Sequence, residues 1–179
     1  MPIPTFWAPW PGNRNAVFAI ENLPFACCIV PERRQEITTE GGLNLSRNKN
    51  KIKITIQKLN NSNIRTSLFI NASIKDINLA KKLGTKCIEI HTGKISNLVK
   101  NRKNYQKEFL NIKKCAKYAK SLNLEVHAGH GIDYKTAGIL KDIKEIKEFN
   151  IGHFIIGESI TSGINKTNKN FKKLIKRWT

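Results

Sequence analysis

The sequence predicts one α/β domain built on a parallel β-sheet. Short apolar segments typical of buried strands begin near residues 25, 65, 87, 124 and 153, and each interval between them has room for a helix. Each of these segments except the second is followed directly by polar residues and glycine. Because a strand–helix–strand alternation implies right-handed crossovers, the strands are expected to be parallel and their ligands to gather at the carboxyl ends.

The composition supports a single domain with a hydrophobic core. The chain has 179 residues, of which 40% are hydrophobic, and a formal net charge of +19 from 32 Lys+Arg against 13 Asp+Glu. Such a charge attracts polyanions whatever the fold. The lysines are spread over the predicted helices and show no aromatic interleaving, so a basic nucleic-acid-binding protein is the weaker alternative.

Cysteine usage and hydropathy predict a cytoplasmic protein without membrane contact. Cys27 and Cys28 are adjacent, Cys87 and Cys115 stand alone, and no C-x-x-C spacing occurs, so we expect reduced thiols and neither a zinc site nor a disulfide framework. No apolar run approaches the roughly 20 residues that cross a bilayer. The first residues lack the basic start and apolar core of a signal peptide.

Residues 1–24 are expected to form an irregular leader, and residues 25–179 the folded domain. The leader has no period of 2 or 3.6 and does not read as a strand–helix unit. It is rich in proline and aromatic residues, namely Pro2, Pro4, Phe6, Trp7, Pro9, Trp10, Pro11 and Pro24.

The first half of the domain is predicted from local signals. A strand at residues 25–30 ends at Pro31, and a charged, hydroxyl-rich segment follows up to Gly42, either a solvated loop or a substrate loop in which Thr38 offers a hydroxyl. A helix is expected over residues 46–60 and a strand over 65–70. The next helix begins after Ser73, with Asp76 in a capping-box position, and closes at Gly84.

The second half continues the alternation. We expect a strand at residues 87–90, a long basic helix at 104–122 and a strand at the start of LEVHAGHGID, residues 124–133. A helical segment at 134–148, a strand at 153–156 and a last helix reaching Trp178 complete the prediction.

Glu89 is the first candidate functional residue. Period two places Glu89 and His91 on one face of the strand, with Ile88 and Ile90 on the other. A carboxylate in a strand buried on both faces needs a partner or a task. A structural salt bridge to a lysine and a catalytic role are both open from this feature.

The histidines favour catalysis by their grouping. His91, His130 and His153 each fall at or beside a predicted strand end with glycine nearby, where proton transfer near neutral pH would be useful. No pair has the helical spacing of metal ligands, so no metal is expected. The amides of Gly131, Gly152 and Gly157 would suit phosphate groups, although no Walker or dinucleotide fingerprint occurs.

Five segments together resemble pyridoxine 5'-phosphate synthase, a family of the vitamin B6 route that starts from deoxyxylulose phosphate. They follow the order and spacing of that family from about residue 25 to the end. The segments are VPERRQEITTEGG at 30–42, SLFI at 67–70, EIHTG at 89–93, AGHG at 128–131 and NIGHFIIGES at 150–159.

The resemblance implies a TIM-type (β/α) barrel and a condensation reaction. The family joins 1-deoxy-D-xylulose 5-phosphate to 3-amino-2-oxopropyl phosphate, closing the pyridine ring and releasing phosphate and water. Such chemistry requires proton shuttles and anion sites but no cofactor, metal or redox group.

The resemblance also implies a role for individual residues. His130 matches the family's proton donor and Glu89 its transition-state stabiliser. Thr38 matches the contact to the deoxyxylulose phosphate. The positions that match the site of the aminoketone phosphate are Gly131, Gly152 and His153.

The chain departs from the family at its N-terminus. A barrel has eight strand–helix units in about 250 residues, whereas five are predicted here, corresponding to the fourth to eighth. The motifs of the first three strands, including the glutamate base, have no counterpart in residues 1–24. We therefore expect a partial barrel that is either an inactive truncated or frameshifted fragment, or is completed by another chain or by self-association into a homo-oligomer.

Overall fold

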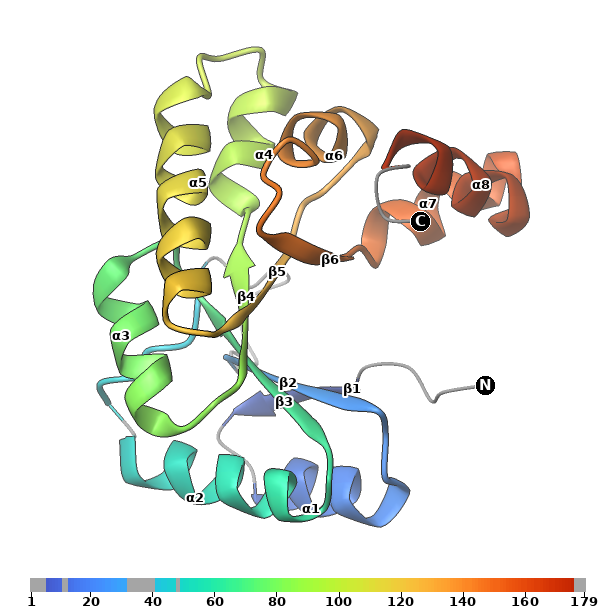
Figure 1. The fold of residues 1–179 in the computed structure, drawn as a ribbon. Coiled ribbons are helices and arrows are strands. Elements are labelled where there is room, and N and C mark those ends of the chain that lie inside the picture. Colours follow the sequence, from blue (N-terminus) through green and yellow to red (C-terminus); the bar gives the residue numbers. More distant parts are fainter. Residues whose placement is uncertain (1–5, 11–12, 32–40, 48, 176–179) are drawn as a thin grey trace.

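The computed structural model describes residues 6–10, 13–31, 41–47 and 49–175, and these residues build a six-stranded parallel sheet (Figure 1). Each strand pairs with the one that follows it in the chain, which confirms the α/β class and the parallel sheet. The strands are β1 (Phe6–Trp10), β2 (Ala26–Pro31), β3 (Arg65–Ile70), β4 (Cys87–His91), β5 (Glu125–Gly129) and β6 (Ile146–Asn150).

The helices lie around the outside of the curved sheet in the order of the chain (Figure 1). The first two, α1 and α2, lie near strands β1, β2 and β3, and the last two, α7 and α8, lie beyond β6. In the described part of the chain no helix is both long and apolar enough to cross a membrane. The helices are α1 (Asn13–Asn22), α2 (Lys49–Asn61), α3 (Ile74–Leu83), α4 (Gly93–Lys100), α5 (Gln106–Ser121), α6 (Tyr134–Leu140), α7 (His153–Ser162) and α8 (Ile164–Leu174).

Alternation along the strands separates an apolar face from a polar one. Side chains of one parity are fully buried in the core that the helices cover, as Leu68, Ile88 and Val126 are. Side chains of the other parity include Glu89 and His127, which the register places opposite each other. The core therefore lies between the sheet and the helices, and the opposite face carries the residues capable of chemistry.

The signals around α3 act as predicted. Ser73 caps the helix by accepting a hydrogen bond from the backbone N–H of Asp76, and Gly84 ends it in the left-handed conformation at φ 89°. The residues Ile52, Ile56 and Leu59 of α2 are buried, as the spacing of the apolar residues indicated.

The expectation of an irregular leader is wrong for its described part. Residues 6–10 form β1, which pairs with β2 from Phe6 opposite Cys27 to Trp10 opposite Pro31, and α1 follows. Pro9 lacks a backbone N–H, but β1 lies at an edge of the sheet and pairs on one side only, where a proline is tolerated. The described sheet therefore has six strands where five were predicted.

The predicted assignment of the C-terminal segment is also wrong. The helix expected over residues 134–148 ends at Leu140, residues 146–150 form β6, and the strand expected at 153–156 is the start of α7. A short apolar run does not distinguish a strand from a buried helix. Here the contacts decide, since the Phe154 ring packs 5.0 Å from that of Tyr134 and 5.8 Å from that of Phe171, between centroids.

Candidate active site

Glu89 is buried on the polar face of β4. Its side chain is 3% exposed, and its Oε2 accepts hydrogen bonds from the Asn150 amide at 2.7 Å and from the Cys28 thiol at 3.3 Å. Burial raises the pKa of the Glu89 carboxyl to about 7, although both hydrogen bonds oppose the shift. The group can therefore gain or lose a proton near neutral pH.

Gly129 makes room for this carboxylate. It lies on β5 between β4 and β6, and a Cβ atom at this position would collide with Glu89 Oε1 and lie 3.3 Å from Asn150 Cβ. The requirement for glycine is thus steric, because the carboxylate occupies the space a side chain would fill.

His130 follows Gly129 directly and stacks on His91. The two imidazole centroids are 4.8 Å apart with an interplanar angle of 24°, and the edge of Phe69 meets the His91 ring at 5.2 Å. His130 has φ 82°, a conformation that side chains rarely adopt and that concentrates at functional sites. Burial, and then the nearby His153, lower the pKa of His130.

Thr92 holds the backbone of this turn. Its buried hydroxyl lies 2.7 Å from the Gly129 carbonyl oxygen and 2.8 Å from that of His130, within donating distance of both. Gly131 follows at φ 72°, and a Cβ there would come 3.0 Å from Ser96 Cβ. The strand-to-loop turn is therefore fixed in one conformation by α4 and the residue before it.

Gly152 and His153 begin α7 at the end of the polypeptide segment that follows β6. Gly152 is the residue before the first turn, and His153 is the first helical residue. Gly157, whose amide was also expected to suit a phosphate, lies in the interior of α7 and not at its N-terminus. Free backbone N–H groups at a helix N-terminus attract anions. The N-terminus of α7 thus lies at the same edge of the sheet as His130.

The structure brings together most of the residues predicted from sequence. Glu89, His130, Gly131, Gly152 and His153 all lie at or near the carboxyl edge, while Thr38 lies outside the described residues. The segment that follows Thr38 returns to the same edge, because Leu43 donates a backbone hydrogen bond to the Phe69 carbonyl at 2.7 Å.

Sequence reasoning missed three residues that support Glu89, namely Cys28, Gly129 and Asn150. Asn150 stands in a quoted motif, but its partner is on a strand that begins some sixty positions earlier, so no local pattern reveals the pair. Within the described residues, a group of metal-binding type occurs elsewhere, at Cys87, Glu125 and His127.

Comparisons with known proteins agree on one family. A family model described as pyridoxal phosphate biosynthesis protein PdxJ matches residues 12–177. The chain is 60% identical over 156 residues to a pyridoxine 5'-phosphate synthase of Pelagibacter ubique (strain HTCC1062), covering 87% of this chain and 65% of that protein. It is 43% identical over 157 residues to the synthase of Zymomonas mobilis, covering 88% and 60%. The chain thus spans less than two thirds of the length of these relatives.

Among solved structures, the fold is similar to the crystal structure of citrate synthase SbnG. The TM-score is 0.60 at 9% sequence identity, over 99% of this chain and 74% of that one. At that identity the likeness concerns the fold alone.

Proposed function

The chain belongs to the family of pyridoxal phosphate biosynthesis protein PdxJ, as its motifs predicted, and on that premise we propose that it acts in forming pyridoxine 5'-phosphate. The proposed reaction condenses 1-deoxy-D-xylulose 5-phosphate with 3-amino-2-oxopropyl phosphate and releases phosphate and water. The observation that carries the proposal is the titratable Glu89 carboxyl packed against Gly129, directly beside His130.

Glu89 is proposed to stabilise charge in the transition state. The condensation of an amine with a ketone forms a C–N bond and expels the ketone oxygen as water, so positive charge develops on nitrogen. A buried carboxylate that is already oriented by Asn150 and Cys28 loses little energy to reorganisation as that charge appears.

His130 is proposed to donate the proton that a departing hydroxyl needs. A donor must be protonated, whereas burial and His153 lower the pKa of His130 in the free protein. A dianionic phosphate at the N-terminus of α7 would offset the His153 charge and raise that pKa. Substrate binding would then protonate His130 before the step that uses it.

The two phosphate groups are assigned to two parts of the carboxyl edge. Gly131, Gly152 and His153 are proposed to hold the aminoketone phosphate, since α7 offers free N–H groups there. Thr38 is proposed to contact the deoxyxylulose phosphate, because the segment from Gly41 onward packs against the end of β3.

The sheet is proposed to be part of a TIM-type barrel. The six described strands are parallel, follow sequence order and curve with helices on the outside, as consecutive units of an eight-stranded barrel do (Figure 1). Apolar side chains of α7 and α8, including Ile156 at 65% and Ile160 at 82% exposure, support the further proposal that copies associate into a homo-oligomer. The four cysteines of the chain are free thiols, which supports the proposal of a cytoplasmic location.

The test is product formation by the purified 179-residue chain supplied with both substrates. We expect pyridoxine 5'-phosphate from the parent chain, and a loss of about 10²-fold or more in His130→Ala and Glu89→Gln. Glu21→Gln alters an exposed carboxyl on α1 and should turn over normally. A folded parent chain without turnover would contradict the proposal and favour the inactive-fragment alternative, and an active His130→Ala would remove the role given to His130.

A further inference from the structure

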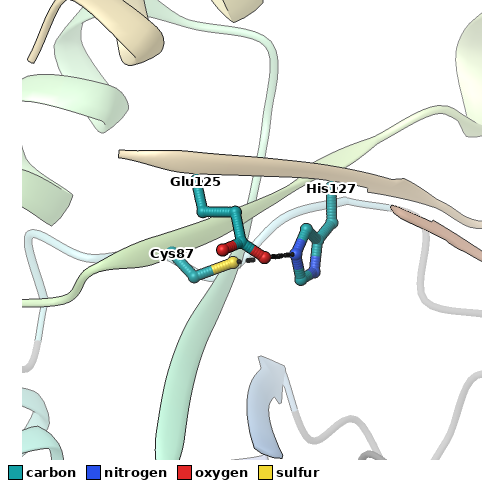
Figure 2. A group of neighbouring side chains, drawn as sticks. All are labelled: Cys87, Glu125 and His127. Carbon is teal, nitrogen blue, oxygen red and sulfur yellow. Dashed lines mark hydrogen bonds and ion pairs between the residues drawn. The ribbon is translucent and has the colours of Figure 1, made fainter. Parts of the chain in front are cut away.

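A second group of reactive side chains lies on the same face of the sheet as Glu89, toward the amino ends of β4 and β5, and the register places its member His127 opposite Glu89. Cys87 and Glu125 are the first residues of β4 and β5 and stand directly opposite each other in the register. His127 is two residues further along β5, so its side chain is on the same face. Figure 2 shows the three side chains pointing toward one another from the two strands.

Their ligand atoms converge on one point. His127 Nε2 lies 3.3 Å from Cys87 Sγ and 2.6 Å from Glu125 Oε1. In a nucleophilic triad the thiol and the carboxylate contact different nitrogens of the imidazole. Here both contact the same nitrogen, which is the arrangement of a shared centre and not of a proton relay.

The distances suit a small metal ion. Bonds of about 2.3 Å to sulfur and about 2.0–2.1 Å to nitrogen and oxygen place tetrahedral ligand atoms roughly 3.3–3.6 Å apart. The observed sulfur–nitrogen separation of 3.3 Å is within about 0.3 Å of the tetrahedral value, and the nitrogen–oxygen separation of 2.6 Å must lengthen by about 0.7 Å. The Glu125 side chain is 41% exposed, which gives an ion access from solvent, while His127 is 2% exposed, and Glu125 must shift within its ion pair with Arg65 to open that distance.

The surrounding charges complete the site. Arg65 donates to Glu125 at 2.7 Å and to Glu148 at 2.9 Å, which orients both carboxylates. Glu148 Oε1 lies 3.7 Å from His127 Nδ1, the nitrogen that faces away from Cys87, in the position of a carboxylate that orients a metal-bound histidine. If Cys87 is a thiolate, its negative charge and those of the Glu125 and Glu148 carboxylates balance the positive charges of Arg65 and a divalent ion.

We propose that Cys87, Glu125 and His127 bind one divalent transition-metal ion of the zinc type, with water as the fourth ligand. On binding, the thiol of Cys87 releases its proton to solvent and the sulfur donates an electron pair to the ion. The proton of neutral His127 moves from Nε2 to Nδ1, and Glu148 Oε1, now 3.7 Å from Nδ1, moves about 0.7 Å closer to accept a hydrogen bond from it. No oxidation or reduction occurs.

The role of the ion is structural. The three ligands tie the amino ends of β4 and β5, and Arg65 and Glu148 extend the connection to β3 and β6. The sequence did not predict this site because its ligands have no motif spacing, and only the pairing of two strands brings them together. The site does not depend on the proposed synthase activity.

The test is titration of the purified chain with Co²⁺, because cobalt bound to a thiolate produces a charge-transfer band in the near ultraviolet. We expect that band at one equivalent, its displacement by Zn²⁺, and a higher melting temperature with Zn²⁺. Cys87→Ser should abolish the band, and Glu148→Gln should weaken Co²⁺ binding about 10-fold. Cys115→Ser removes another buried thiol, outside the group, and should leave the band intact.

Three results would overturn the proposal. They are a parent chain without the band, a band that survives in Cys87→Ser, and equal loss in Cys115→Ser. If Cys87→Ser does not fold, the titration of the parent chain is compared with that of His127→Asn. We expect His127→Asn to lose the cobalt band at one equivalent. Turnover is not a readout, so these results stand whether or not the synthase assay succeeds.

Discussion

Asn150 on β6 binds Glu89 on β4 across the intervening strand β5, through a hydrogen bond of 2.7 Å. The contact exists because Gly129, which lies between them, has no side chain. Three strands thus contribute to one carboxylate site. The strand β4 supplies the acid, β6 supplies the amide donor, and β5 supplies a glycine that leaves room for the contact.

Gly129→Ala should displace the Glu89 carboxylate. The new methyl group would overlap Glu89 Oε1, so we expect a loss of about 1–3 kcal/mol in the free energy of unfolding and a loss of turnover. Gly138→Ala in α6 is the control, since its added methyl group would meet Leu174 of α8 at an ordinary 3.8 Å and should raise the free energy of unfolding by about 0.5–1 kcal/mol. Urea unfolding measures both, and equal effects of the two substitutions would refute the steric role of Gly129.

Glu89→Gln should stabilise the protein at alkaline pH. The pKa of Glu89 rises from 4.5 to about 7 on folding, so the favourable contribution of its protonated form is complete below pH 4.5 and is lost as the pH rises through 7. Glutamine stays neutral at every pH. The free energy of unfolding of the variant should therefore exceed that of the parent by about 2–3 kcal/mol at pH 8 but not at pH 4. Denaturant unfolding at the two pH values checks this, and a parallel shift at both would show that charge burial is not the cause.

Thr92→Val should loosen the turn that carries His130. The substitution keeps the shape but removes the hydroxyl that serves the carbonyls of Gly129 and His130, at a cost of about 1–2 kcal/mol. Thr136→Val is the matched control, because the buried Thr136 hydroxyl has no hydrogen-bond partner in the described part of the chain and its removal should be neutral or stabilising. Thermal and urea unfolding of the pair isolate the hydrogen bonds, and similar losses in both variants would count against them.

His130→Gly should be more stable than His130→Ala by about 1 kcal/mol. Both variants lose the imidazole and its stacking on His91, but only glycine adopts φ 82° without strain. The difference in unfolding free energy between the two variants therefore measures the backbone strain at position 130. Equal stabilities would mean that the position is not strained.

Local signals predicted those parts of the fold that depend on neighbouring residues. The cap and end of α3 follow from Ser73, Asp76 and Gly84, and the buried strand at Glu89 follows from the alternation around it. The strand β1 was not predicted because it contains Pro9. Proline is tolerated in an edge strand but not in a central one, and the sequence does not show which strand lies at the edge. The exchange of strand and helix near residues 146–156 arose because an apolar run has no unique period.

The environment of the site required strand pairing as well. Motifs placed Glu89 and His130 at one edge, but the support from Cys28 and Asn150 depends on which strands are neighbours and in what register. The same holds for Cys87 opposite Glu125. Such contacts between distant positions leave no trace in spacing along a single chain.

The sequential order of the six strands has a consequence for how the molecule assembles. Every strand pairs only with strands adjacent in the chain, so the cohesion of the sheet is close to a sum of nearest-neighbour terms, as in repeat proteins. Each pairing closes only the segment between one strand and the next, which lowers the entropy lost before each contact forms relative to pairing between distant strands. Folding can therefore spread from one strand–helix unit to the next along the chain.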